Sequence, residues 1–259
     1  MNAQPCQRWH TKRDSYRPAG EPIQTARYEV HAFRSDSEAR DFVTTHHYSG
    51  TYPAARFRFG LYHGPFLVGV AVFSHPCNDA TLTNVFGGKA TDAVELGRFV
   101  LLDSVPSNGE TWFLGQCFAQ LKGHVSGVLS FSDPVARSSE DGHTLFPGHV
   151  GTIYQAHNAV YLGRGTRRTL KLLPDGTVLS ERALSKIRSQ ERGREYAVEQ
   201  LVKHGAAKPD GDLRAWLAEW LPRVTRPLVH PGNHKYGWQL FARRRWSLPA
   251  SLPYPKKED

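Results

Sequence analysis

The sequence lacks any long apolar run, and this excludes one class of protein at once. No stretch of the 259 residues approaches the ~18 uninterrupted apolar residues of a membrane-spanning helix. The first residues, Met1 to Pro5, contain no apolar signal core, so we expect no secretory leader. Cysteine is also scarce: Cys6, Cys77 and Cys117 are odd in number and too widely spaced for a disulfide framework or a CxxC metal site. We therefore interpret them as reduced thiols and expect a cytoplasmic protein without membrane contact.

Acidic residues are in the minority, and the imbalance is local. The chain has 33 basic and 24 acidic residues, for a net charge of +9. Residues 164–259 hold 20 of the basic and 10 of the acidic residues, whereas residues 46–163 hold 6 and 8. A cationic surface of this kind binds nucleic acid in a salt-dependent way, because each contacted phosphate releases counterions. Solubility alone is the competing explanation.

The composition and the apolar periodicity predict a folded α+β protein. Apolar residues make up 39% of the chain, with 13 Phe, 10 Tyr and 6 Trp, which is too aromatic for a disordered sequence. Alternating and helical spacings up to residue 163 follow the order β-α-β-β-β-α-β-α-β without an internal repeat. The expected parts are a flexible N-terminal arm over 1–25, a core over 26–165, a basic helical and hairpin part over 166–246, and a flexible tail over 247–259. In the basic part, a single helical run is expected from Ser180 to His204.

Two short polar segments are candidates for chemistry. Ser132-Asp133-Pro134 ends an apolar strand, where a carboxylate can act as a general base, bind a metal or orient an amino group. Asp before Pro is also a common turn starter. His46-His47-Tyr48 lies on a polar aromatic loop, where one imidazole and a phenol could join a distant carboxylate around a metal. Loop histidines are more often simply solvated.

Two further segments have the residue types of an anion site. In a regular strand, Glu95 and Gly97 share a face and Arg98 points the other way, among apolar neighbours. Arg98 could therefore bind a carboxylate or phosphate, or pair with Glu95. Asn108, Gly109 and Thr111 begin a helix whose free N–H groups could hold an anion, although every helix needs such a cap.

The basic third contains separate clusters of cations mixed with aromatic rings. Positive charge beside flat rings suits phosphate contact combined with base stacking. The candidate DNA-binding residues are Arg164, Arg167, Arg168, His234, Lys235, Tyr236, Arg243, Arg244 and Arg245.

Taken together, these segments resemble the Mom family of phage DNA-modification proteins. The resemblance rests on Glu95 to Leu101, on Leu129 to Pro134 and on His149 to Ala156, with His47-Tyr48-Ser49 and Pro231 to Tyr236 also fitting. It implies a fold like the GCN5-related N-acetyltransferases, with a mixed, mainly antiparallel sheet flanked by helices and a basic C-terminal extension. It also implies addition of a carbamoylmethyl group to N6 of adenine in phage DNA, which protects that DNA from host restriction.

The same resemblance assigns roles to individual residues. Asp133, Tyr154, Ser132 and Tyr48 would belong to the catalytic centre. Arg98, Asn108, Gly109 and Thr111 would bind the cofactor or donor. His47, Tyr48 and Asp133 would bind a metal, with iron as the expected ion. The partner would be double-stranded DNA with a flipped adenine in the host cytoplasm, and the oligomeric state, a homodimer included, is left open.

One departure from the acetyltransferase pattern bears on the donor. Acetyltransferases of this fold carry Gln/Arg-x-x-Gly-x-Gly/Ala before the helix that holds the coenzyme A pyrophosphate, whereas this chain has a single Gly followed by Glu110. The donor is therefore acetyl-CoA or another small molecule. The N6 amine is conjugated with the ring and is a poor nucleophile, and the enzyme must extrude the base to reach it. The alternatives are an acyl-CoA-dependent N-acyltransferase on a small amine or protein, and a DNA-binding protein without catalysis.

Overall fold

A computed structural model describes residues 5–11, 13–18, 20–240 and 248–256 of the chain. Their contacts divide the protein into two compact units. Unit 1 contains residues 1–134, 149–164 and 233–259, and unit 2 contains residues 135–148 and 165–232. These boundaries differ from the expected ones. Residues 135–148, expected in the core, belong to unit 2, and residues 233–246, expected in the basic part, belong to unit 1.

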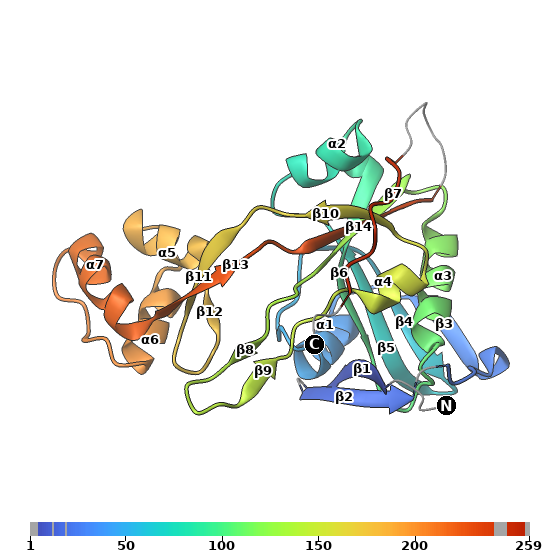
Figure 1. Cartoon of the computed structure of the whole chain (residues 1–259), viewed down its shortest axis with the longest axis horizontal. Coiled ribbons are helices and arrows are strands. Elements are labelled where there is room, and N and C mark those ends of the chain that lie inside the picture. Colours follow the sequence, from blue (N-terminus) through green and yellow to red (C-terminus); the bar gives the residue numbers. More distant parts are fainter. Residues whose placement is uncertain (1–4, 12, 19, 241–247, 257–259) are drawn as a thin grey trace. The chain divides into compact units, whose positions relative to one another are not determined.

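Unit 1 is built on a seven-stranded sheet with the order β10-β14-β7-β6-β5-β4-β3 (Figure 1). The strands are β3 (Tyr28–Ala32), β4 (Ala55–His63), β5 (Phe66–Ser74), β6 (Ala93–Leu101), β7 (Gly127–Ser132), β10 (Val160–Arg164) and β14 (His234–Gln239). Neighbouring strands are antiparallel except β6 and β7, which are parallel. The prediction of an α+β fold with a mixed, mainly antiparallel sheet is confirmed.

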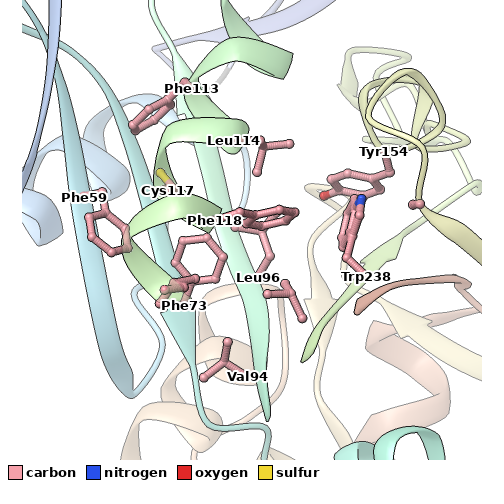
Figure 2. Packing of buried hydrophobic residues seen from close by; sticks show 14 of the residues in the cluster. Phe59, Phe73, Val94, Leu96, Phe113, Leu114, Cys117, Phe118, Tyr154 and Trp238 are labelled. Carbon is pink, nitrogen blue, oxygen red and sulfur yellow. The ribbon is translucent and has the colours of Figure 1, made fainter. Parts of the chain in front are cut away.

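Helices cover both faces of this sheet. They are α1 (Ser37–His46), α2 (Ala80–Phe86), α3 (Gly109–Leu121) and α4 (Thr152–Ala156), with 3-10 turns at Thr25–Arg27 and Ala90–Asp92. Phe113, Cys117 and Phe118 of α3 pack with Tyr154 of α4 and Trp238 of β14 in the main core, as Figure 2 shows. The α1 side chains pack instead on Val70 and Val72, on the other face. Each fully buried apolar side chain in these layers contributes about 1.5–3 kcal/mol to folding.

The central parallel strands separate after a short pairing. The ladder joins Ala93–Glu95 of β6 to Gly127–Leu129 of β7 and then ends. Past that point the Ser130 hydroxyl donates to the Leu96 carbonyl at 3.2 Å. We call this divergence the fork. It matters because backbone no longer fills the space between the two strands, and side chains from both faces can meet there.

Residues near the two ends of the described chain make hydrogen bonds within unit 1. Strands β1 (Pro5–His10) and β2 (Arg13–Pro18) form a hairpin, although their sequence shows no period. At the other end, the Leu252 amide donates to the Tyr161 carbonyl at 3.1 Å, and the Tyr254 hydroxyl donates to the Ala159 carbonyl at 2.7 Å. Both ends are held by partners far away in the sequence, which local patterns do not reveal.

Unit 2 has its own sheet, ribbon and helical core. Its elements are β8 (Arg137–Ser138), β9 (Thr144–Phe146), β11 (Arg168–Leu172), β12 (Val178–Leu179), β13 (Arg226–His230), α5 (Glu181–Arg188), α6 (Glu195–Lys203) and α7 (Leu213–Val224). Leu184, Leu201 and Trp216 bury against one another in the core. The expected single helical run is two helices, because Gln190 and Gly193 adopt φ values of 53° and 79° and end the first one. Within the described residues, no helix is long and apolar enough to cross a membrane.

Candidate active site at the fork of the central strands

A bulge in β6 brings two charged side chains onto one face. Val72 lies opposite Arg98 and Phe73 lies opposite Leu96, so Gly97 is an extra residue in β6. An extra residue resets the alternation of a strand. The sequence analysis placed Arg98 and Glu95 on opposite faces of a regular strand. This is wrong, because the extra residue Gly97 shifts the alternation by one position. Leu96 and Phe99, which would lie on opposite faces of a regular strand, both pack in the core beside α3.

Arg98 holds the loop that follows α1. Its Nε donates to the Thr51 carbonyl at 2.8 Å, its Nη2 to Thr51 Oγ1 at 2.6 Å and its Nη1 to the Gly97 carbonyl. The half-buried guanidinium also interacts with Glu95 and with the phenols of Tyr48 and Tyr154. Burial lowers its pKa, and these neighbours oppose that shift. Arg98 therefore positions the His47 loop beside the fork.

His47 is buried at the start of this loop and is neutral. The Ser49 amide donates to His47 Nδ1 at 3.2 Å, and Ser49 Oγ lies 2.9 Å from the same atom. Burial holds the pKa of His47 well below its usual value, and the charges of Arg98 and His149 lower it further. Because Nδ1 accepts an amide proton, the proton of the neutral ring lies on Nε2. The Tyr48 ring lies 4.2 Å from the His47 ring, centroid to centroid.

Tyr154 projects from α4 and reaches the same place from the other side of the sheet. Figure 2 shows its ring beside Trp238, facing Leu96 and Phe118. Its phenol interacts with Ser130, Glu95 and Arg98. Burial raises the pKa of Tyr154, so the phenol stays protonated at neutral pH. Close packing fixes the ring, because a Cβ on Gly151 would lie 2.8 Å from it.

The end of β7 adds Ser132 and Asp133, together with a histidine that the sequence analysis did not assign to the site. The His149 amide donates to the Asp133 carbonyl at 2.8 Å. Burial lowers the pKa of His149 to about 4, while the nearby Asp133 raises it and His234 lowers it. His149 also lowers the pKa of His47, which shows that the loop after α1 lies near the segment that follows β7. Its position beside the Ser-Asp-Pro turn depends on a loop of fourteen residues in unit 2, which explains why the sequence alone did not reveal it.

Two residues predicted to bind DNA are buried in this site instead. His234 is 1% exposed, and its Nδ1 lies 2.8 Å from the Tyr161 hydroxyl. Tyr236 is 0% exposed and donates a short hydrogen bond to the Val150 carbonyl. Alternation on β14 points both toward the core, which corrects their assignment as surface contacts. Burial raises the pKa of Tyr236 to about 12.

The other predicted DNA contacts have different positions. Arg164, Arg167 and Arg168 are exposed, and Lys235 is half-buried on the face of β14 opposite to His234 and Tyr236. Arg243, Arg244 and Arg245 lie outside the described residues.

The start of α3 lies beside the N-terminal segment of the chain. Asn108 is exposed, Gly109 is buried, and the Thr111 hydroxyl donates to the Asn108 carbonyl at 3.1 Å. The residues around them bind the N-terminal segment: Arg8 pairs with Glu110, and Glu21 binds Ser107. The side chains around Gly109 are those of Ile23, Leu101 and Val105.

The predicted iron ligands combine one histidine, one tyrosine and one carboxylate. Within the described part of the chain, no three His, Cys, Asp or Glu side chains are grouped so that they could hold a metal ion. His47 presents Nε2 with its proton in the arrangement seen here, whereas a metal needs a free lone pair. His47, Tyr48 and Asp133 have suitable donor atoms for iron, but binding would require a change of tautomer. Iron at these residues stays a prediction.

Comparison with known proteins identifies the family. A search of curated proteins gives no significant match. Among solved structures, a tandem GNAT protein from the clavulanic acid biosynthesis pathway, determined without AcCoA, matches at 8% identity with a TM-score of 0.43. The match covers 84% of this chain and 100% of that chain. The model of the Mom protein family matches residues 28–214, which include His47, Arg98, Asp133 and Tyr154. The chain belongs to the Mom protein family.

Proposed function

We propose that this protein adds a carbamoylmethyl group to N6 of adenine in phage DNA and thereby protects the DNA from host restriction. Membership of the Mom family supports DNA modification in general. The observation that most supports the finer proposal is the convergence at the fork, where His47, Arg98 and Tyr154 come from three separate segments and interact.

The residues near the fork can be assigned roles in such a transfer. In the transfer, N6 forms a bond to the methylene carbon of the donor, the bond from that carbon to the donor's leaving group breaks, and the leaving group keeps the electron pair. The amine then loses a proton, and a carboxylate is a suitable acceptor. In this proposal Asp133 accepts the proton, with His149 beside it. His149 stays neutral at pH 7 because its pKa is about 4, so it does not compete as a cation.

Tyr154 and Arg98 would act on the donor and on the loop. A phenol whose pKa is raised does not act as a base near neutral pH, but its O–H can donate a hydrogen bond to an oxygen that gains negative charge. Arg98 supplies the permanent positive charge of the fork and keeps His47 and Tyr48 in place through Thr51. Tyr48 is the candidate for stacking on an extruded adenine.

Nucleoside mass spectrometry tests the proposal. DNA from host cells that express the protein is digested and compared with DNA from cells that express Asp133→Asn. We expect a carbamoylmethyl adduct on deoxyadenosine with the wild type and none with the variant. Unmodified deoxyadenosine beside folded wild-type protein would contradict the proposal, and acetyl-CoA binding without any dependence on DNA would favour an acyltransferase.

Metal analysis tests the iron prediction separately. If iron binds at the fork, His47→Ala lowers the iron content of protein purified without oxygen, and His63→Ala, at an exposed position on β4, does not. Equal iron content in the wild type and His47→Ala would remove His47 from the ligand set.

A further inference from the structure

The loop between β6 and α3 is occupied by the chain's own N-terminal segment. Arg8 of β1 is 5% exposed, and its Nε donates to Glu110 Oε1 at 2.5 Å. Its other nitrogens donate to three backbone carbonyls: Leu102 at 3.0 Å, Pro106 at 2.8 Å, and Val105 through a short bond. The loop thus turns its carbonyl oxygens toward a guanidinium.

The Glu21 carboxylate, from the same segment, accepts a hydrogen bond from the Ser107 amide of this loop. Glu21 Oε2 accepts from the Ser107 amide at 3.1 Å, and the Glu21 amide donates to Ser107 Oγ at 3.1 Å. Arg17 holds this carboxylate with two bonds of 2.7 and 2.8 Å. The hydrogen bond from Arg17 is the main reason that the pKa of Glu21 is lowered. Ser15 completes the attachment by donating to Asp103 at 2.7 Å. We name Arg8, Ser15, Arg17 and Glu21 the N-terminal clasp.

The clasp reverses what the start of a long helix usually offers. Free N–H groups at such a position attract phosphate. Here the N–H of Ser107, one residue before the N-cap Asn108, already binds the Glu21 carboxylate. The carboxylates of Glu21, Asp103 and Glu110 all interact with Arg17. An incoming phosphate would have to displace Glu21 from the Ser107 amide and compete with carboxylates for Arg8 and Arg17, which are already paired.

We propose that the N-terminal clasp is a built-in occupant of the phosphate-binding end of α3, and that the donor in the proposed reaction carries no phosphate or coenzyme A group anchored there. The second half of this inference rests on the proposed function. The donor is then a small molecule held by the fork itself, where Arg98 and Tyr154 present the hydrogen-bond donors.

Limited trypsin digestion of the full chain tests the clasp. In the wild type, the bond after Arg8 resists cleavage because the Arg8 side chain is bound, while the exposed Arg13 in the hairpin is cut. Glu21→Gln removes the charge that holds Arg17, which loosens the segment and speeds cleavage after Arg8 about tenfold. Glu29→Gln makes the same charge change at an exposed position on β3 and leaves that rate unchanged. Rapid cleavage of the wild type after Arg8 would overturn the clasp.

Thermal melting with coenzyme A or inorganic pyrophosphate, each at about 1 mM, tests the consequence for the donor, since a ligand that binds the folded state raises the melting temperature. We expect no shift for the wild type. A saturable shift with coenzyme A would overturn the inference about the donor. Because neither readout involves DNA, a failed adenine assay with an intact clasp would reject the proposed function alone.

Discussion

At the scale of single residues, Tyr154 shows why a buried phenol can belong to an active site. Its ring is part of the core, yet its hydroxyl lies among Ser130, Glu95 and Arg98. The ring and the hydroxyl therefore have separate roles, and one substitution separates them.

Tyr154→Phe keeps the ring and removes the O–H. We expect the adenine adduct to fall about 10²-fold, because a hydrogen bond to developing charge is lost. The free energy of unfolding should change by only about 1 kcal/mol, the net value of one hydrogen bond. Nucleoside mass spectrometry and urea unfolding measure the two quantities. Tyr62→Phe, which loses a hydrogen bond to Glu38 on the exposed side of β4, should leave the adduct unchanged, and an unchanged adduct in Tyr154→Phe would remove this residue from the site.

At the scale of elements, the attachment of β1 to the start of α3 depends on a buried ion pair. The side chains of Arg8 and Glu110 are 4% and 5% exposed. A buried charge that loses its partner is costly, whereas an exposed pair contributes little.

Arg8→Met leaves Glu110 buried without its partner. We expect the free energy of unfolding in urea to fall by about 3–5 kcal/mol. The double variant Arg8→Met/Glu110→Met should recover most of that loss, because both charges are then gone. Arg223→Met breaks an exposed pair with Glu219 on α7 and should cost less than about 1 kcal/mol. Equal losses in Arg8→Met and Arg223→Met would show that the N-terminal hairpin is not bound as described.

The hydrogen bond from Tyr236 of β14 to the Val150 carbonyl, before α4, leads us to expect that the protein loses stability at alkaline pH. The phenol of Tyr236 has a pKa of about 12 in the folded protein, above its ordinary value of 10.0. The unfolded chain therefore loses this proton first as pH rises. The contribution of the protonated phenol to the free energy of unfolding is fully present below pH 10 and is lost between pH 10 and 12. The loss is about 2–3 kcal/mol. Urea midpoints across this range should decrease less in Tyr236→Phe, whereas Tyr254→Phe, at an exposed position, should follow the wild type.

At the scale of the whole molecule, the chain passes between its two units four times. The passages are at Pro134, His149, Arg164 and Asn233, which border the ends of β7, β10 and β14 and the segment leading to α4. Asp133, His149 and His234 are therefore next to the residues where unit 2 leaves the sheet.

The exposed cations at the second passage into unit 2 give a test of DNA binding. Arg167→Ala/Arg168→Ala should reduce the slope of log affinity against log salt by about 2, since each phosphate contact contributes about 0.9. Anisotropy titrations of labelled duplex DNA at several salt concentrations measure the slope. Lys89→Ala/Lys122→Ala removes the same charge from exposed positions on unit 1 and should keep the slope. An unchanged slope in the arginine variant would place the DNA surface elsewhere.

The sequence by itself determined those features that depend on local periodicity. Phe113, Leu114, Cys117, Phe118 and Leu121 have helical spacing, and α3 spans them all. The strands β4, β5 and β7 were also identified, because short apolar runs bounded by turn residues are a local signal. The Ser-Asp-Pro turn, the His47 loop and Arg98 were also identified from residue type.

Only the tertiary structure decided how these pieces meet. The Gly97 bulge reversed the face of Arg98, β14 buried His234 and Tyr236, and a loop from unit 2 brought His149 back to Asp133. Arg8 and Glu21 likewise bind Glu110 and Ser107 at the start of α3, although they lie about ninety positions earlier in the sequence. Contacts of this kind depend on register and long-range closure, and one inserted residue is enough to change the face on which a side chain lies.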